Sequence, residues 1–112
     1  METRLVVTNA NTFDEAASFL YVLGYSERLK ILWHLKSREL CVTELCKLSG
    51  LSQSAMSQHL SKLRALKIVN CRRDAQFMYY SASHKVCYEI FSLLERLDFL
   101  KFNVLIDPDF KI

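Results

Sequence analysis

Glycine and proline are scarce in this chain of 112 residues, which has 2 Gly and 1 Pro. Such scarcity argues against a turn-rich all-β fold and favours helices. No apolar run approaches the length of a membrane span, and residues 1–10 lack the apolar core of a signal peptide. We therefore expect no membrane partner and a cytoplasmic location. The apolar share of 51% and charged share of 24% are typical of a globular chain, which excludes general disorder.

Residues 1–112 are enough for one domain and too few for two. The four cysteines, Cys41, Cys46, Cys71 and Cys87, do not form the dense framework of a secreted disulfide protein. In a reducing compartment they are expected to be thiols, metal ligands or redox sensors. The net charge of +3 is too small to identify a partner, so the distribution of charge matters more than its sum.

Four helices are predicted in the first two thirds of the chain. The first has Thr12 as its N-cap and Glu15 three residues later, and it ends near Gly24. The second is expected to have Ser26 as its N-cap and to run to about Lys36, the third to run from Cys41 to Leu48, and the fourth to have Ser52 as its N-cap and to run to about Leu66. Gly50 supplies the tight turn before the fourth helix.

The period of the apolar residues then changes from helical to alternating. Ile68–Arg73 and Gln76–Ser81, separated by Asp74 and Ala75, are predicted to form a β-hairpin. A last helix begins near Ser83 and carries a stripe with the spacing of a helix–helix seam, formed by Val86, Ile90, Leu93, Leu97, Leu100 and Val104. Residues 103–112 are expected to form a C-terminal tail.

A helix, a glycine turn, a second helix and a hairpin describe a winged helix-turn-helix, so we predict a mainly α fold with a small β-hairpin. On a helical wheel the fourth helix has two unlike sides. Met56, Leu60 and Leu63 form an apolar side that should pack inward. The opposite side carries small, uncharged polar residues, which let a helix approach base edges in the major groove of DNA.

Positive charge is concentrated in the same segment of the chain. From Ser52 to Arg73 the chain has no Asp or Glu but carries five Lys and Arg residues. A hairpin with Arg72 and Arg73 at its base would lie along a DNA backbone or enter the minor groove. The candidate DNA-binding residues are Ser52, Gln53, Ser54, Ser57, Gln58, Ser61, Lys62, Arg64, Arg72, Arg73 and Gln76.

Two other interpretations compete with DNA binding. A Ser- and Gln-rich helix side is also typical of a solvated surface, in which case the winged helix would serve protein–protein contact without any DNA role. A thiol enzyme would need a Cys, a His and an acid in a supporting arrangement, which the sequence does not offer. We therefore expect that the protein is not an enzyme. Steep loss of affinity with salt would identify a DNA binder.

Several segments resemble the ArsR/SmtB family of bacterial winged-helix repressors, and within it the HlyU/BigR-like branch. They are Glu39–Leu45 (ELCVTEL), Leu51–Arg64 (LSQSAMSQHLSKLR), Val69–Arg73 and the pair Tyr79-Tyr80. The resemblance covers about residues 12–102. It implies a homodimer that binds double-stranded DNA at an inverted-repeat operator and is released when a metal, metalloid or oxidant arrives. The implied dimer interface joins the first and last helices through Phe13, Ala17, Leu20, Val86, Ile90, Leu93, Leu97 and Leu100.

The chain departs from the family's known sensors. Arsenic-sensing members have three thiols where this chain has Cys41, Thr43 and Cys46. Zinc-sensing members have Asp and His on the last helix, where this chain has Leu97 and Leu100 after an early His84. The redox-sensing branch pairs two cysteines whose positions correspond here to Trp33 and Phe99. We therefore expect no metal site and no required cofactor.

Two thiols are the redox candidates. Cys41 and Cys87 lie near predicted helix N-termini, which favour the thiolate. Cys41 is the leading candidate because oxidation there would disturb the helix that supports the fourth one. The alternative is that each is a small buried apolar residue.

Two further residues of the fourth helix have predicted structural roles. His59 projects toward the apolar side and is expected to bond to the backbone or to a neighbouring helix. Lys67 stands where the family usually has the glycine that ends this helix.

Overall fold

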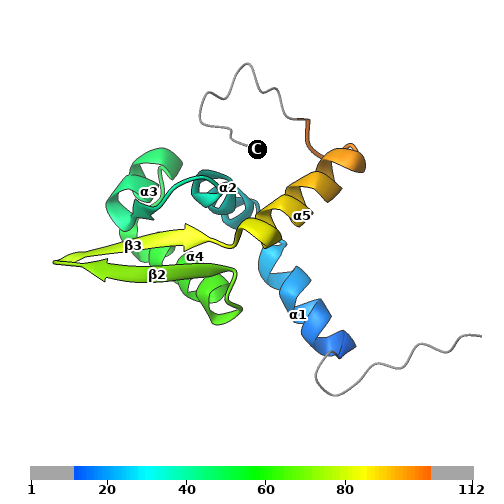
Figure 1. Ribbon diagram of the computed structural model, residues 1–112, viewed down its shortest axis with the longest axis horizontal. Helices are drawn as coiled ribbons and strands as arrows, with labels where there is room; N and C mark the ends of the chain where they lie inside the picture. Colours follow the sequence, from blue (N-terminus) through cyan, green and yellow to red (C-terminus); the bar gives the residue numbers. More distant parts are fainter. Residues whose placement is uncertain (1–11, 102–112) are drawn as a thin grey trace, which may run out of the picture.

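Five helices and a three-stranded sheet make up residues 12–101, the part of the chain that the computed structural model describes (Figure 1). The elements are α1 (Phe13–Leu23), α2 (Ser26–Leu35), β1 (Leu40–Cys41), α3 (Val42–Ser49), α4 (Gln53–Ala65), β2 (Val69–Asp74), β3 (Phe77–Ala82) and α5 (His84–Arg96). This order confirms the predicted winged helix-turn-helix. The predicted tail, 103–112, lies outside the described residues.

Hydroxyl side chains start three of the helices. The Oγ1 atom of Thr12 accepts the Glu15 N–H at 3.1 Å, and Ser52 and Ser83 accept in the same way at the starts of α4 and α5. Each bond satisfies a backbone donor that helix geometry leaves unpaired. The start of α2 differs from the prediction, because Tyr25 is its N-cap and Ser26 its first residue.

The core is built around α2, which lies between the other helices. Ile31, Leu32 and Leu35 of α2 and the predicted apolar side of α4, Met56, Leu60 and Leu63, are each 2% exposed or less. Burial of such side chains contributes roughly 1.5–3 kcal/mol each relative to exposure. The packing of α4 on α2 and α3 therefore determines which side of α4 faces outward.

The sheet contains a strand that the sequence analysis missed. β1 pairs with β3 through Leu40↔Tyr80 and Cys41↔Tyr79, which gives the strand order β1-β3-β2. The hairpin turn is also displaced by one residue, since Asp74 pairs with Phe77 and the loop residues are Ala75 and Gln76. Ala75 has a φ of 56°, so the loop tolerates a left-handed residue without glycine.

α5 ends earlier than the predicted apolar stripe. The Asp98 N–H bonds to the Glu95 carbonyl at 3.0 Å, the Phe99 N–H bonds to the Leu94 carbonyl at 2.9 Å, and Asp98 has a φ of 63°. This is a Schellman termination, which Asp tolerates because its short side chain suits the left-handed region. The helix ends at Arg96, so Leu97 and Leu100 follow it rather than belong to it, and Val104 lies outside the described residues.

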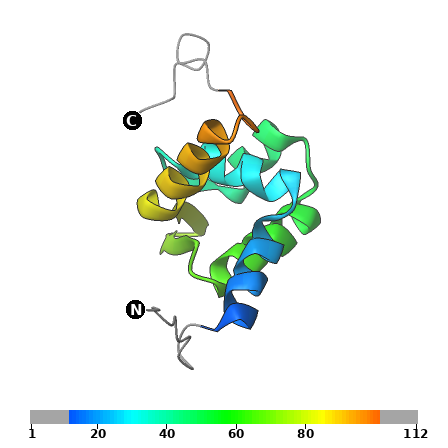
Figure 2. The ribbon, with the colours of Figure 1, turned by 90° about the vertical axis from the view of Figure 1, so that its right-hand side faces the viewer.

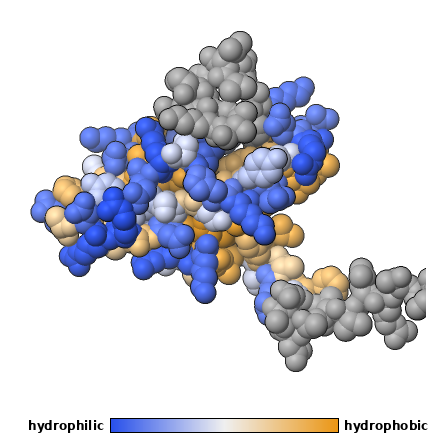
Figure 3. All heavy atoms as spheres, in the orientation of Figure 1, coloured by the Kyte–Doolittle hydropathy of each residue, from blue (hydrophilic) through white to orange (hydrophobic). Residues whose placement is uncertain are grey.

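The helices α1 and α5 lie at the end of the molecule opposite the hairpin (Figures 1 and 2). Large apolar side chains are exposed on them, including Phe13 at 79% and Leu20 at 64%, and Leu93 of α5 and Leu97 just after it are also exposed. Figure 3 shows apolar colour over α1 and beside α5, and mainly hydrophilic colour over the hairpin except at its tip. Within residues 12–101, no helix combines the length and apolar character that crossing a bilayer requires.

Lys67 ends α4 in the left-handed conformation, with a φ of 60°. Its N–H bonds to the Arg64 carbonyl at 2.9 Å, and the next N–H, that of Ile68, bonds to the Leu63 carbonyl at 3.0 Å. Glycine is the usual residue at this point of a Schellman motif. The chain therefore carries a strained lysine at the junction between α4 and β2.

Replacing Lys67 with Gly should raise the free energy of unfolding by up to about 1 kcal/mol, because the left-handed conformation costs a side chain about that much. Lys62→Gly, inside α4, is the matched control and should lower it by about 0.5–1 kcal/mol. Urea unfolding of both variants measures the difference. Equal destabilisation by both changes would show that Lys67 is not strained.

Candidate nucleic-acid interface

The polar side of α4 faces outward along its whole length. Every residue that the sequence analysis assigned to this surface on α4 and its N-cap is exposed, namely Ser52, Gln53, Ser54, Ser57, Gln58, Ser61, Lys62 and Arg64. The apolar side is buried at the same time. A helix with one buried side and one neutral polar side can present donors and acceptors to a groove without moving the core.

The N-terminus of α4 is suited to an anion. Ser52 caps it, and its first turn has no acidic residue. By helix geometry the first N–H groups, those of Gln53 and Ser54, have no intrahelical partner, and the helix dipole favours negative charge beside them. Such an end can hold a phosphate of a nucleic-acid backbone.

A buried arginine ties α4 to α2. Arg28 is 8% exposed, and its Nε donates to His59 Nδ1 at 3.1 Å while its Nη1 donates to the Val22 carbonyl at 3.0 Å. The Tyr25 ring covers the guanidinium at 4.1 Å. His59 therefore bonds to a neighbouring helix, as predicted, and helps to fix the rotation of α4 about its axis.

A shallow hollow of about 420 Å³ lies where α4 meets β3. Its lining residues are Ser57, Leu60, Ser61, Arg64, Ala65 and Tyr80. Tyr80 was not among the predicted site residues, although the alternation along β3 and the family resemblance at Tyr79-Tyr80 both pointed to this strand. Burial raises the pKa of Tyr80, and the neighbouring Cys71 thiol raises it further, so the phenol stays protonated and can donate a hydrogen bond.

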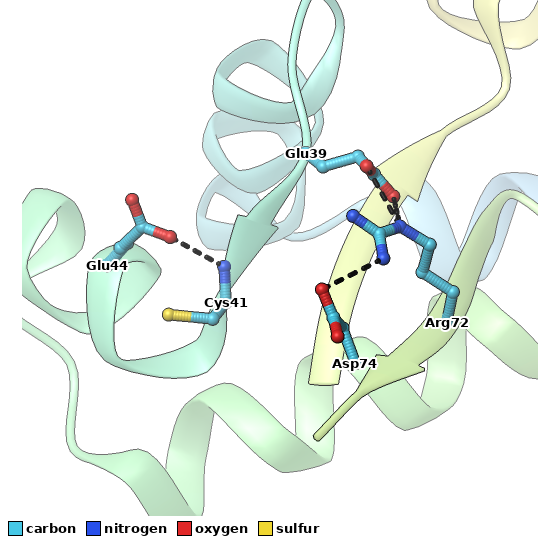
Figure 4. Close-up of polar contacts among 5 residues, drawn as sticks. All are labelled: Glu39, Cys41, Glu44, Arg72 and Asp74. Carbon is cyan, nitrogen blue, oxygen red and sulfur yellow. Dashed lines mark hydrogen bonds and ion pairs between the residues drawn. The ribbon is translucent and has the colours of Figure 1, made fainter. Parts of the chain in front are cut away.

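The hairpin residues Arg72, Arg73 and Gln76 are exposed, as an interface requires. Both arginines already have partners within the chain. The Nε of Arg72 donates to the Glu39 carboxylate at 2.8 and 3.1 Å (Figure 4), and the Nε of Arg73 donates to the Ala75 carbonyl at 3.2 Å. The predicted separation of basic and acidic residues is thus incomplete, because Glu39 reaches the hairpin.

The two redox candidates lie in unlike surroundings. Cys41 is the half-buried N-cap of α3, and its N–H donates to Glu44 Oε1 at 3.0 Å (Figure 4). This bond lowers the pKa of Glu44, so a carboxylate is present beside the thiol.

Cys87 corrects the prediction, because it is 3% exposed and burial raises its pKa to about 11. Its position near the α5 N-terminus does not offset burial. Among residues 12–101, no three His, Cys, Asp or Glu side chains gather closely enough to hold a metal ion.

Comparison with known proteins agrees with this geometry. The model of the family described as bacterial regulatory protein, arsR family, matches residues 26–70. The nodulation protein NolR of Rhizobium meliloti is 49% identical over 79 residues, which cover 70% of this chain and 65% of NolR. The transcriptional activator HlyU of Vibrio cholerae is 41% identical over 83 residues, which cover 74% of this chain and 77% of HlyU.

A solved structure extends the likeness to three dimensions. The crystal structure of NolR from Sinorhizobium fredii superposes with a TM-score of 0.72 at 41% identity, over 84% of this chain and 96% of that one. The sequence resemblance and the winged-helix fold are therefore both confirmed. The chain belongs to the arsR family of bacterial regulatory proteins, whose members are DNA-binding transcriptional regulators and not enzymes.

Proposed function

We propose that the protein is a homodimeric transcriptional repressor that binds an inverted-repeat operator through the outward side of α4 and the β2–β3 hairpin. One observation supports this most directly: the polar side of α4 is exposed over its whole length while the apolar side is buried. From chromosomal DNA as the partner we infer a cytoplasmic location. The proposal requires no cofactor.

The proposed operator is tested by selecting duplexes that the protein binds from a random pool and sequencing them. Two half-sites in inverted orientation, about one helical turn apart, are the expected result. The best-bound duplex then serves as the probe for variants. Recovery of no preferred sequence, with no salt-dependent binding, would instead favour a protein–protein module.

Replacing Ser57 with Glu should reduce affinity for the selected duplex by roughly 10- to 100-fold per subunit, because the new carboxylate faces base edges and phosphates. Ser26→Glu at the exposed start of α2 is the control with the same charge change. Fluorescence anisotropy measures both affinities, and thermal melting checks the fold. Unchanged affinity in the Ser57 variant would remove α4 from the interface.

The dimer is proposed from the exposed apolar residues at the end formed by α1 and α5. Contiguous apolar surface of this kind marks interaction sites, and Phe13 and Leu20 are far more exposed than core residues of similar type. Ala17 shares the exposed side of α1, whereas Val86 and Ile90 of α5 are half-buried and would complete the contact. The family resemblance favours a second copy of this chain as the occupant.

Leu20→Glu or Leu93→Glu should convert the dimer to a monomer, because a charge would be buried in an apolar interface. Loss of the second half-site contact should lower DNA affinity by about a hundredfold or more. Sedimentation equilibrium measures the mass, with Leu48→Glu on exposed α3 as the control. A dimer that survives both changes would place the contact elsewhere.

Release from DNA by thiol oxidation is proposed for Cys41. It is the more accessible of the two candidates, and it caps α3, which packs on α4.

Under iodoacetamide in the native state, Cys41 should be labelled before Cys87, whose burial and raised pKa protect it. Mass spectrometry of peptides measures the order, and labelling in denaturant is the control in which all four thiols react. In parallel, Cys41→Ser should retain the selected duplex under hydrogen peroxide. If that variant releases DNA as readily as the wild type, Cys41 is not the sensor.

A further inference from the structure

A cluster of charged side chains, Glu39, Arg72 and Asp74, lies on one face of the sheet (Figure 4), and the Tyr79 ring lies beside Arg72. Glu39 directly precedes β1, Arg72 belongs to β2, and Tyr79 belongs to β3, the central strand between them. Glu39 and Arg72 are 33 positions apart in the chain. The contact therefore links the hairpin to the segment that leads into α3.

The guanidinium of Arg72 is held from several directions. Its Nε lies 2.8 Å and 3.1 Å from the two Glu39 oxygens, its Nη1 lies 3.8 Å from Asp74 Oδ2, and its Cζ lies 4.9 Å from the Tyr79 ring centre. The hydrogen bond that Arg72 donates to Glu39 is the main reason that the pKa of Arg72 is raised. One cation thus faces two carboxylates, so the cluster offers no net positive charge to DNA.

Arg72 and Arg73 point to opposite faces of the sheet, because side chains alternate along a strand. Arg73 shares its face with Cys71, which pairs with Tyr80, and Tyr80 lines the hollow beside α4. Arg72 pairs with Tyr79 on the other face. Of the two neighbouring arginines, only Arg73 is on the side of the sheet where α4 lies.

The position of the cluster along the hairpin is also informative. β1 contributes only two register pairs to β3, and Tyr79 is the outer of the two residues it pairs with. Residues 73–78, beyond this point, are all exposed. Through its pairing with Tyr79, Arg72 therefore lies at the last position where β1 supports the hairpin, and Glu39 reaches it from the residue before β1.

We propose that Glu39 and Arg72 form a brace that holds the β2–β3 hairpin at the angle needed on DNA, so that Arg73 rather than Arg72 gives the hairpin's charge to phosphate. The inference rests on the proposed DNA-binding function. Both residues act through the orientation of the hairpin and are positioning residues. Exposed ion pairs contribute little to stability individually. The expected effect on DNA affinity is therefore small and arises because a change at the base of the hairpin alters the position of its tip.

The test compares Glu39→Gln, Arg72→Gln, the double variant and the exchanged pair Glu39→Arg/Arg72→Glu. Arg73→Gln is the matched control, since it removes the same charge from the next position. Affinity for the selected duplex is measured over a series of salt concentrations, with a hydroxyl-radical footprint for each variant. Thermal melting and amide hydrogen exchange of the free protein report on the fold and on the hairpin.

The brace predicts that each single variant loses DNA affinity by about two- to fivefold. The double variant should lose no more than either single variant, because both substitutions break the same contact. Their salt slopes should match the wild type, and their footprints should weaken only at the flanks of each half-site. The exchanged pair should restore affinity. Arg73→Gln should instead flatten the salt slope by about 0.9 per subunit. Amides of β2 and β3 should exchange faster in the Glu39 and Arg72 variants than in the Arg73 variant.

Either of two results would overturn the brace. One is an Arg72→Gln variant that flattens the salt slope as Arg73→Gln does, with an exchanged pair that binds no better, which would make Arg72 a phosphate contact. The other is a Glu39→Gln variant that binds more tightly than the wild type, which would make Glu39 a mask on a DNA-binding cation. A wild-type protein with no salt-dependent binding would contradict the proposed function. Amide hydrogen exchange of the free protein would still test the brace, because it compares the β2 and β3 amides of the Glu39, Arg72 and Arg73 variants without DNA.

Discussion

The burial of one side of α4 against α2 and α3 determines the direction in which its polar side faces. Met56, Leu60 and Leu63 are removed from solvent, and rotating α4 to bury its polar side would strand serine and glutamine side chains in an apolar core. Such burial without partners costs several kcal/mol. The outward direction of Ser54, Ser57 and Ser61 follows from the core and needs no ligand to establish it.

Contacts with neighbouring elements further fix the orientation of α4. The Arg28–His59 hydrogen bond joins α2 to the middle of α4, and the Schellman turn at Lys67 leads directly into β2. The helix and the hairpin therefore share a short, hydrogen-bonded junction. A surface that must fit a groove and a neighbouring backbone together gains from such a junction, because fewer orientations have to be ordered on binding.

The parts of the fold that local patterns encode could be predicted from the sequence. A helical wheel of α4 identified its apolar and polar sides. The change in the spacing of apolar residues from helical to alternating identified the hairpin. Non-local features could not be found this way. Glu39 lies far from Arg72 in the chain, so a count of acids along Ser52–Arg73 missed it, and β1 is only two residues long.

Competition between local and tertiary effects explains the remaining differences. Cys87 has the expected place near a helix N-terminus, yet its contact with the core determines its pKa, as its Sγ lies 3.9 Å from the Leu32 carbonyl. The stripe that continued through Leu97 and Leu100 suggested a longer α5, but Asp98 adopts a left-handed conformation that the apolar spacing does not reveal. Exposure of every predicted α4 site residue, by contrast, follows from the same periodicity that builds the core.

Site-specific photo-cross-linking can show which surface of the protein lies against DNA. A photoreactive amino acid is placed at Gln58, on the outward side of α4, or at Tyr88, which is exposed on α5. We expect cross-links to the selected duplex from position 58 and not from position 88. Cross-links from position 88 with none from position 58 would contradict this orientation, because DNA would then lie against α5 and not against the outward side of α4.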